Sequence, residues 1–394
     1  MTFDQHLAAA QATFQDWLGR VDRAGRTVVF CHFDADGLGA GALFGRGLPL
    51  LGLEDVVVVP SGRSESAFSD AARDRLRALA PDALVVTDLG VNARGTLEAD
   101  GVPVLYVDHH RPSGVPDGGP QPGGPQPGGP QPGVPQTGGA AVVSGYDWDP
   151  IPCSAWLAYD LLEGAVPGVD EMRELDWIAA VGVISDLGEK APWPLLADAK
   201  KRHTAKWLKE TVALVNAARR APTFDAHAAL DALMTFDGPK ALATAETPEA
   251  ERLREARDVV KAEVAEARKA APVFSDRPAR GGVAPDDLRF ALVRVHSRAQ
   301  VHPLIAQQWR GRLKGYPVIC ANTGYLDGLV AFSTRSSRTD VSLPEVYQAI
   351  DTGAWNGRWG HGHDQASGGH LPPDVFNGVL DALGFAPDAH VPDA

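Results

Sequence analysis

Four short apolar runs, rich in β-branched residues, constrain the fold of this chain more than any other feature. They are Thr27–Cys31, Val56–Val59, Leu84–Thr87 and Val102–Val107. Runs of this length and composition are typical of buried β-strands. Helix-like stretches, such as residues 64–79, separate at least the first three of them. This alternation of strand and helix predicts an α/β fold with a mostly parallel, doubly wound sheet.

Acidic and imidazole side chains follow three of these runs, at the point where each predicted strand ends. A further aspartate ends the apolar helical segment 181–186. The residues are His32, Asp34 and Asp36 after the first run, Asp88 after the third, Asp108, His109 and His110 after the fourth, and Asp186 in the helical segment. Ligands of an open parallel sheet bind beyond the carboxyl ends of its strands. We therefore expect these side chains to converge at one edge of the sheet.

Five aspartates and three histidines in one place would repel and desolvate one another unless a positive charge compensated them. A single acidic residue after a strand, such as Asp88, is more often a helix cap or a loop residue than a metal ligand. The pattern His-x-Asp-x-Asp-Gly at 32–37, together with Asp-His-His at 108–110, is much harder to explain in that way. Mixed carboxylate and imidazole ligands suit Mn²⁺ or a similar divalent cation.

The composition changes along the chain and divides it into parts. Residues 113–139 are built around the repeat Gly-Gly-Pro-Gln-Pro, which offers almost no apolar side chain to bury. We expect a disordered insertion there rather than a lid over the site. The pattern then becomes helical, and strand-like runs return after residue 280. These changes predict a metal-binding domain at 1–240, a helical linker at 241–279 and a smaller α/β substrate domain at 280–394.

Charge and cysteine usage exclude several classes of function. The 37 Lys and Arg residues against 50 Asp and Glu residues give a net charge of −13. Such a charge argues against general binding of long duplex nucleic acid, but not against a short nucleotide held by metals. The three cysteines form no CxxC pair, so neither a cysteine zinc cluster nor a disulfide framework is expected. Because no signal peptide or membrane span is recognisable, we expect a cytoplasmic protein.

The motifs resemble, in order and spacing, those of the DHH phosphoesterase superfamily. The matching residues are His32-Phe33-Asp34-Ala35-Asp36-Gly37, Asp88, Asp108-His109-His110 and Asp186. The resemblance covers the chain up to Asp186. The family includes RecJ-type single-strand exonucleases, oligoribonucleases (nanoRNases) that also dephosphorylate 3′-phosphoadenosine 5′-phosphate, cyclic-dinucleotide phosphodiesterases and family II pyrophosphatases.

A glycine-rich segment at residues 360–369 resembles the Gly-Gly-Gly-His-x-x-Ala-Ala-Gly signature of the DHHA1 substrate domain, and we expect it to form a phosphate-binding loop. His361 stands where the signature has glycine, and Ser367 replaces an alanine. Glycine amides can form an anion-binding nest, and a guanidinium can grip a phosphate with two hydrogen bonds. By this resemblance the substrate-binding residues are Arg335, Gly360, Gly362, His363 and Gly368.

Carried over residue by residue, the family pattern implies two metal ions. One would take His32, Asp34 and Asp88, and the other Asp36, Asp88, His109 and Asp186, so that Asp88 bridges the two. Asp108 would orient an imidazole, and His110 would lie close to the scissile phosphate as an acid or a charge stabiliser. Two metals ~3.5–4 Å apart can activate a water and stabilise the attacking and leaving oxygens. Mn²⁺ is the expected cation, with Mg²⁺ or Co²⁺ as alternatives.

The resemblance implies a Mn²⁺-dependent phosphodiesterase that hydrolyses short nucleotides by means of a metal-activated water. The expected substrates are linear oligoribonucleotides, dinucleotides such as pApA, or cyclic dinucleotides such as cyclic di-AMP. A RecJ-like exonuclease acting on single-stranded DNA is the first alternative. A pyrophosphatase is less favoured because the C-terminal segment resembles DHHA1, and a non-catalytic nucleotide sensor is a further alternative. A homodimer is also implied, whereas neither duplex DNA nor a membrane is an expected partner.

Overall fold

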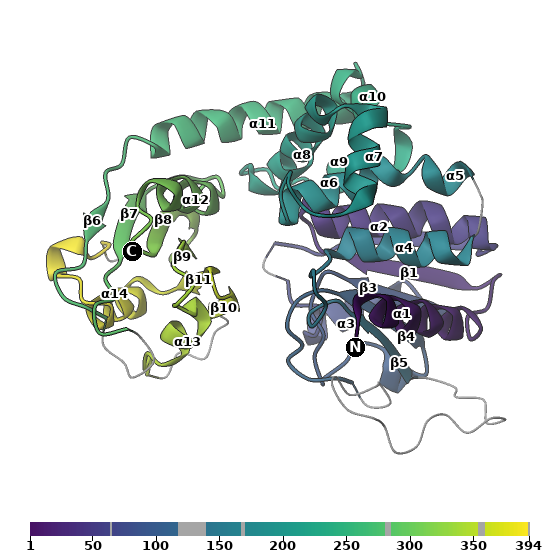
Figure 1. The fold of residues 1–394 in the computed structure, drawn as a ribbon, viewed down its shortest axis with the longest axis horizontal. Coiled ribbons are helices and arrows are strands. Elements are labelled where there is room, and N and C mark those ends of the chain that lie inside the picture. The colour runs from purple at the N-terminus through teal and green to yellow at the C-terminus, as the bar shows by residue number, and fades with distance from the viewer. Residues whose placement is uncertain (64, 117–138, 167–169, 280–284, 354–358, 393–394) are drawn as a thin grey trace. The chain divides into compact units, whose positions relative to one another are not determined.

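The computed structural model describes the chain except for residues 64, 117–138, 167–169, 280–284, 354–358 and 393–394 (Figure 1). The chain divides into two compact units. The N-terminal unit comprises Met1–Arg219 and Phe224–Arg254, and the C-terminal unit comprises Arg220–Thr223 and Glu255–Ala394. Among the described residues, no helix is both long enough and apolar enough to cross a membrane.

A five-stranded sheet forms the centre of the N-terminal unit, with the strand order β2-β1-β3-β4-β5. Its strands are β1 (Arg26–Cys31), β2 (Asp55–Pro60), β3 (Ala83–Thr87), β4 (Pro103–Asp108) and β5 (Gly139–Ser144). Every neighbouring pair runs parallel. The winding direction reverses between β1 and β3, and this switch point is where doubly wound sheets bind ligands. The predicted fold class is confirmed for this unit.

Helices cover both faces of the sheet (Figure 1). Helices α1 (Phe3–Leu18), α2 (Ala35–Gly47), α4 (Ser154–Ala165) and α6 (Asp176–Asp186) contribute to the larger hydrophobic core, which Val29 of β1 joins. Helix α3 (Asp70–Ala78) contributes to a smaller core on the other face, which Phe30 of β1 joins. Adjacent residues of β1 thus enter different cores, because successive side chains of a strand point to opposite faces.

Helix α2 lies close to the sheet because glycines face the strands. A Cβ atom on Gly41 would lie 2.6 Å from Cys31 Sγ, and one on Gly45 would lie 2.6 Å from Val58 Cγ2. This close approach fixes the beginning of α2 at the end of β1. The remaining helices of the unit are α5 (Asp170–Arg173), α7 (Pro194–His203), α8 (Ala205–Arg220), α9 (Ala226–Thr235) and α10 (Pro239–Thr244), with 3-10 turns at Leu48–Leu51 and Glu98–Asp100.

Strand β5 is an element that the sequence analysis missed. It pairs with β4 in a register that runs from Pro103↔Gly139 to Asp108↔Ser144. Its apolar part is short and directly follows the glycine- and proline-rich repeat, whose composition hides the strand signal. Residues 117–138 of the predicted insertion lie outside the described residues. The predicted end at residue 139 is wrong, because Gly139 is already the first residue of β5.

A mixed six-stranded sheet forms the C-terminal unit, with the strand order β10-β11-β9-β8-β7-β6. Its strands are β6 (Val273–Phe274), β7 (Ala291–Val295), β8 (Val318–Leu326), β9 (Leu329–Arg335), β10 (Trp359–His363) and β11 (Ala366–Leu371). Strands β7 and β8 pair in parallel, and the other neighbouring pairs are antiparallel. Its helices are α12 (His302–Arg312), α13 (Leu343–Gln348) and α14 (Pro373–Ala382), followed by a 3-10 turn at Pro387–Ala389. The prediction of a second, smaller α/β part is confirmed.

The glycine-rich segment at residues 360–369 forms a β-hairpin, so the prediction of a loop is wrong. Gly362 pairs with Ser367 and His363 with Ala366, and Asp364 and Gln365 make the turn. Glycine weakens strands and is depleted in them, so this segment has no strand signal of its own. Pairing of β11 with β9 supplies the missing stabilisation.

Helix α11 (Pro248–Ala267) connects the two units, and their boundary falls within it, between Arg254 and Glu255. This boundary lies inside the predicted linker at 241–279, whose own limits stay predictions. Leu253, Ala256, Val260 and Val264 recur at helical spacing and are buried. The helix is therefore covered along one side.

Candidate metal centre

The centre begins with the residues that directly follow β1 and β3. His32 donates its backbone N–H to the carbonyl oxygen of Thr87 at 3.2 Å, and Asp88 donates its own to Val107 at 3.1 Å. The sheet thereby holds the first residue beyond each strand. Asp88 has a φ of 61°, in the left-handed region that few residues other than Gly, Asn and Asp tolerate.

The turn from β1 into α2 brings two more carboxylates to the same edge. Asp34 caps the helix, and its Oδ1 accepts hydrogen bonds from the N–H groups of Asp36 at 3.2 Å and of Gly37 at 3.0 Å. A Cβ atom on Gly37 would lie 2.5 Å from His32 Cβ, so the turn requires glycine there. The motif His-x-Asp-x-Asp-Gly is thus a tight strand-to-helix turn that presents its polar side chains together.

His32 lies between the carboxylates of this turn and of β3. Its Nδ1 is 3.3 Å from Asp34 Oδ2 and 3.5 Å from Asp88 Oδ2. Burial lowers the pKa of the imidazole, but Asp34 and Asp88 outweigh this effect and raise the pKa of His32 to about 10. In the absence of metal, a proton therefore occupies the position between these oxygen atoms.

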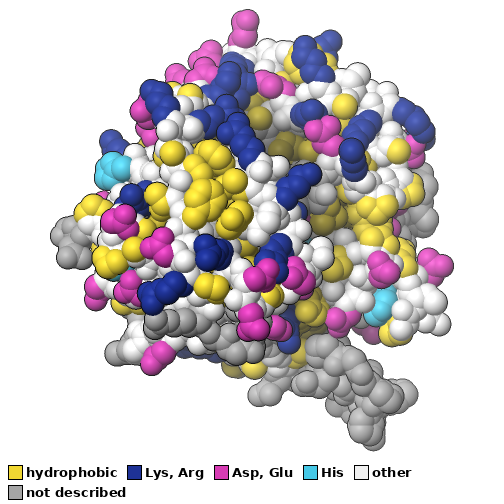
Figure 2. All heavy atoms as spheres, turned by 60° about the vertical axis from the view of Figure 1, so that its left-hand side comes forward, with side chains coloured by type: hydrophobic (Ala, Val, Ile, Leu, Met, Phe, Trp, Pro, Cys, Tyr) yellow, Lys and Arg dark blue, Asp and Glu magenta, His cyan; other side chains and the backbone are white. Residues whose placement is uncertain are grey.

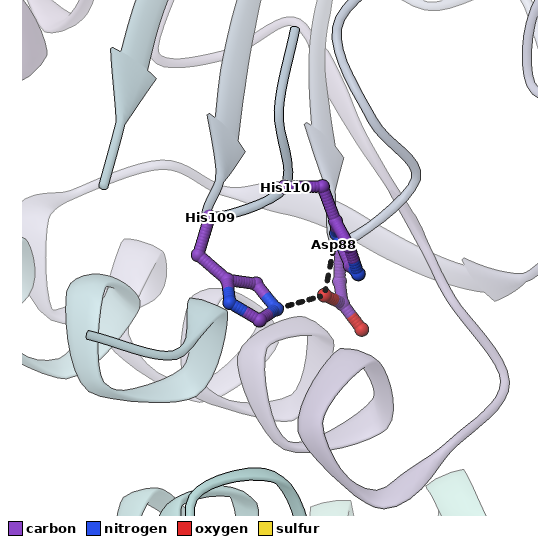
Figure 3. A group of neighbouring side chains, drawn as sticks. All are labelled: Asp88, His109 and His110. Atoms are coloured by element: carbon purple, nitrogen blue, oxygen red, sulfur yellow. Dashed lines mark ion pairs between the residues drawn. The ribbon is translucent and has the colours of Figure 1, made fainter. Parts of the chain in front are cut away.

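Two histidines approach Asp88 from the end of β4, as Figure 3 shows. His109 Nε2 lies 3.4 Å from Asp88 Oδ1, and His110 Nδ1 lies 3.8 Å from the same oxygen. His109 also lies 3.8 Å from Asp36 through Nε2 and 3.8 Å from Asp186 through Nδ1. Asp186 is the last residue of α6, so that helix brings a fourth segment of the chain to the centre.

The potential ligand atoms fall into three overlapping sets, and within each set they lie within 4.8 Å of one another. The sets are His32, Asp34 and Asp88; Asp36, His109 and Asp186; and Asp88, His109 and His110. All six predicted metal ligands are therefore together at the switch point of the sheet, and Asp88 belongs to two of the sets. The assignment of particular ligands to two ions stays a prediction.

Helix α4 supports the centre, and the sequence analysis did not identify this support. Asp36 accepts the N–H groups of Ser154 and Ala155, both at 2.9 Å, at the positively polarised beginning of α4. The Ser154 hydroxyl donates to Asp88 Oδ1 at 3.0 Å. In the sequence, the only sign of this support was a serine at the start of a predicted helix. Serine is common at that position in helices of any function, so it does not indicate a contact with a metal centre.

The carboxylates of Asp36 and Asp186 are poorly compensated. Burial, Asp88 and Asp186 raise the pKa of Asp36 to about 8, although His109 opposes the shift. Burial and Asp88 likewise raise the pKa of Asp186. Burial also acts to raise the pKa of Asp34, but His32, together with Arg219 of α8, lowers it well below its usual value. The side with Asp36 and Asp186 therefore has more negative charge than its surroundings neutralise.

Asp108 and His110 form a pair beside the ligand sets. Asp108 Oδ1 lies 3.0 Å from His110 Nδ1 and accepts the His110 N–H at 2.7 Å, while Oδ2 accepts the N–H of Gly90 at 2.7 Å. Burial raises the pKa of Asp108, but His110 outweighs it and lowers the pKa to about 2. Burial lowers the pKa of His110, and Asp108 raises it overall. Asp108 thus contacts the His110 ring and raises its pKa, while the orienting role expected of Asp108 stays a prediction.

The donor set fits divalent cations. Each set consists of imidazole nitrogen and carboxylate oxygen atoms, the ligand types that Mn²⁺ and related ions accept. Asp36 and His109 are each only 2% exposed, so their charge cannot be neutralised by water. A cation among Asp36, Asp88 and Asp186 would remove the repulsion that raises the pKa of Asp36.

The predicted substrate residues lie on neighbouring strands of the C-terminal unit. His363 of β10 pairs with Ala366 of β11, which pairs with Arg335 of β9, so Arg335 and His363 share one row of the sheet. Arg335 Nη1 donates to the carbonyl oxygen of Thr334 at 2.9 Å. His363 is exposed and Arg335 is half-buried.

Close contacts with neighbouring backbone atoms explain the glycines of this hairpin. A Cβ atom on Gly362 would lie 2.2 Å from the carbonyl oxygen of Ala366, and one on Gly368 would lie 2.5 Å from that of Phe332. Gly360 has a φ of 68°, in the left-handed region. Close backbone packing therefore requires these residues, and their role in binding substrate stays a prediction.

Together, the doubly wound sheet and its carboxylate–imidazole centre define an α/β protein with a metal-site geometry at the switch point. No family profile matches the sequence, and no curated protein matches it. Solved structures do match. An exonuclease RecJ bound to manganese has a TM-score of 0.60 at 21% identity, covering 98% of this chain and 95% of its own.

Two further solved structures agree. RecJ from Thermus thermophilus in complex with Mn²⁺ has a TM-score of 0.61 at 20% identity, over 98% of this chain and 56% of its own, so this chain spans about half of it. The DHH domain of a member of the s1p family of ribosomal proteins has a TM-score of 0.62 at 14% identity, over 98% of this chain and 92% of its own. The chain therefore shares the fold of these RecJ and DHH-domain structures.

Proposed function

We propose that this chain is a metal-dependent phosphodiesterase that hydrolyses short nucleotides. The observation that carries the proposal is the convergence of imidazole and carboxylate groups from four chain segments at the switch point of the sheet. The solved RecJ structures with Mn²⁺ or Mg²⁺ support a divalent cation in this fold. We propose Mn²⁺ as the working ion, held by His32, Asp34, Asp36, Asp88, His109 and Asp186.

The residues around the centre suit the hydrolysis of a phosphate ester. Bound divalent cations would supply a nucleophilic water and neutralise charge on the phosphate. The His110 side chain is 43% exposed, so its ring can reach a bound substrate. Asp108 Oδ1 lies 3.0 Å from His110 Nδ1 and raises the pKa of this ring. We propose that Asp108 orients the ring and that the ring, when protonated, donates a hydrogen bond to a phosphate oxygen as negative charge develops there.

Short substrates fit the charge of the chain. The net charge of −13 disfavours a long polyanion, which depends on many Lys and Arg contacts. On the face that Figure 2 presents, Lys and Arg side chains lie among acidic and hydrophobic ones. We propose that Arg335 and His363 bind a phosphate of a linear dinucleotide or oligoribonucleotide, such as pApA, or of a cyclic dinucleotide, such as cyclic di-AMP.

A RecJ-like exonuclease acting on single-stranded DNA is the second candidate. It is favoured by the likeness to the manganese-bound exonuclease RecJ, of which this chain covers 95%. This candidate requires several basic residues to follow the phosphates of a strand, and it predicts strong inhibition by salt.

A substrate-length series separates the two candidates. Purified protein with Mn²⁺ would be offered two- to five-residue oligoribonucleotides, cyclic dinucleotides and long single-stranded DNA, with product analysis at two salt concentrations. We expect kcat/KM to be highest for the two- to five-residue or cyclic substrates. A preference for long DNA that is lost at high salt would establish the exonuclease instead. Loss of all hydrolysis in Asp88→Asn would assign the activity to this centre.

A further inference from the structure

We propose that Phe33 and Phe224 are specificity-determining residues that stack against a base of the substrate beside the metal centre. The inference rests on the proposed function and deepens it. It requires the substrate to carry an aromatic base next to the scissile phosphate, which inorganic pyrophosphate, polyphosphate and sugar phosphates lack.

Phe33 lies directly beside the ligand sets. It stands in the chain between His32 and Asp34, and its ring centroid is 4.2 Å from that of His32. It is half-buried, so part of the ring is accessible. In a nucleotide only the sugar separates the base from the phosphate, so a phosphate at the metal centre brings its base near this ring.

Phe224 extends the aromatic surface. The centroids of Phe33 and Phe224 are 5.2 Å apart, with planes at 76°, which is an edge-to-face contact. In an edge-to-face contact one ring offers only its edge, so its partner covers neither of its faces. Flat stacking would instead cover a face of both rings. The guanidinium carbon of Arg63 lies 5.0 Å from the centroid of the Phe224 ring, and this cation–π contact holds the ring in place.

Core packing does not explain the position of these two rings. Neither ring belongs to the two hydrophobic cores of the N-terminal unit described above. Phe224 has a φ of 45°, in the left-handed region, where a bulky residue is an outlier. The residue after Phe224 is held in place, because Asp225 donates its backbone N–H to the carbonyl oxygen of Ala218 at 2.9 Å and its side chain caps α9. Backbone strain at the residue whose ring contacts Phe33 supports a role of this pair of rings in binding.

The test compares substrates with and without the base. A dinucleotide would be paired with an analogue in which tetrahydrofuran replaces the base next to the scissile phosphate, and kcat/KM would be measured for both with Mn²⁺. The ratio of the two values reports recognition of the base. We expect Phe33→Ala to lower this ratio about 5- to 150-fold, the range that alanine substitution gives for one base–aromatic stack, mainly through KM.

Matched variants separate stacking from packing. Phe33→Leu keeps apolar bulk without a π-face and should behave as Phe33→Ala does, whereas Phe33→Tyr and Phe33→Trp should keep the wild-type ratio. Phe224→Leu should lower the ratio to a smaller extent. Phe274→Ala removes a phenylalanine that is 45% exposed on β6 and serves as the control. Mn²⁺ affinity, measured by electron paramagnetic resonance, would change if Phe33 only supported its neighbouring ligands.

Two outcomes would overturn the inference while the proposed function stands: a wild-type ratio near one, or a Phe33→Leu variant with the wild-type ratio. If no phosphodiester is hydrolysed, the proposed function fails, and calorimetry on the Mn²⁺-loaded protein still decides the inference. Adenosine monophosphate should then bind at least about fivefold more tightly than ribose 5-phosphate, and Phe33→Leu should abolish that difference. Equal binding of the two compounds would refute base stacking.

Discussion

Metal-free protein should lose stability as the pH rises from 7 to 9, because its centre holds protons that the unfolded chain releases. The pKa of His32 is raised to about 10, whereas an unfolded histidine titrates at about 6.5. The stabilisation that protonated His32 gives to the folded chain is fully present below about pH 6.5 and is lost as the pH rises toward 10. Each pH unit in between removes about 1.4 kcal/mol, or roughly 2.5 kcal/mol between pH 7 and 9.

Two features of the centre modify the expected fall in stability between pH 7 and 9. The pKa of Asp36 is raised to about 8, so around pH 7 the folded chain retains a proton on Asp36 that the unfolded chain has lost. Between pH 7 and 8 the free energy of unfolding therefore falls more steeply with pH than His32 alone would make it. The His32 side chain is 27% exposed, so screening by solvent reduces its share. Asp108 adds no slope, because a carboxyl whose pKa is lowered to about 2 is ionised in both states across this window.

The assay is urea unfolding followed by circular dichroism at pH 7 and pH 9, with EDTA or with saturating Mn²⁺. Bound cations require deprotonated ligands, so Mn²⁺ should raise the free energy of unfolding and remove the fall between the two pH values. His32→Ala should reduce the fall in EDTA, and His227→Gln, which changes an exposed histidine of α9, should not. Constant or rising stability of the EDTA-treated wild type from pH 7 to 9 would refute the reasoning.

Substitutions at three positions test the geometry of the centre and of the hairpin. Asp88→Ala should lower Mn²⁺ affinity, measured by calorimetry, and turnover, measured by product analysis, by more than about 100-fold. Asp88→Asn should also lose turnover, but its circular dichroism spectrum should be unchanged, because asparagine tolerates the same φ as aspartate. Gly182→Ala should cost about 1–3 kcal/mol in urea unfolding, because the new Cβ would lie 2.4 Å from Ala155 Cβ and 2.8 Å from Asp36 Oδ1; a neutral result would contradict the close contact of α6 with α4. Gly368→Ala should lower the melting temperature of the C-terminal unit, because its Cβ would lie 2.5 Å from the Phe332 carbonyl oxygen, and an unshifted melt would contradict the described pairing of β9 and β11.

The parallel sheet was predictable because its signal is local and repeated. Each interior strand is a short β-branched run, and β1 at Arg26–Cys31 differs from the predicted run by one residue. Strands β5, β10 and β11 carried no such signal, since alanine, glycine and serine make up most of β5 and β11, and glycine and histidine make up most of β10. These strands form because a neighbouring strand already offers unpaired backbone groups, and that is a property of the assembled sheet.

The candidate centre was predictable to the extent that strand order decides it. The carboxyl ends of β1, β3 and β4 meet at one edge, so motifs that are far apart in the chain converge without any knowledge of side-chain packing. Ser154 and Phe224 could not be found in this way. Each comes from a segment with no motif: Ser154 contacts Asp88 from the first turn of α4, and Phe224 contacts Phe33 from the segment before α9. Single-sequence patterns do not specify such packing.

Strand β5 is an edge strand of the parallel sheet and pairs with β4, whereas the strands that precede the ligands (β1, β3 and β4) lie inside the sheet. The chain that follows β4 first carries His109 and His110 and then continues through the repeat-rich segment to β5. Doubling the length of a flexible connection costs only about 0.6 kcal/mol in closure entropy. Adding or removing one five-residue repeat between β4 and β5 should therefore change the closure entropy of this connection by less than about 0.6 kcal/mol, so the number of repeats should have little effect on the stability of the sheet.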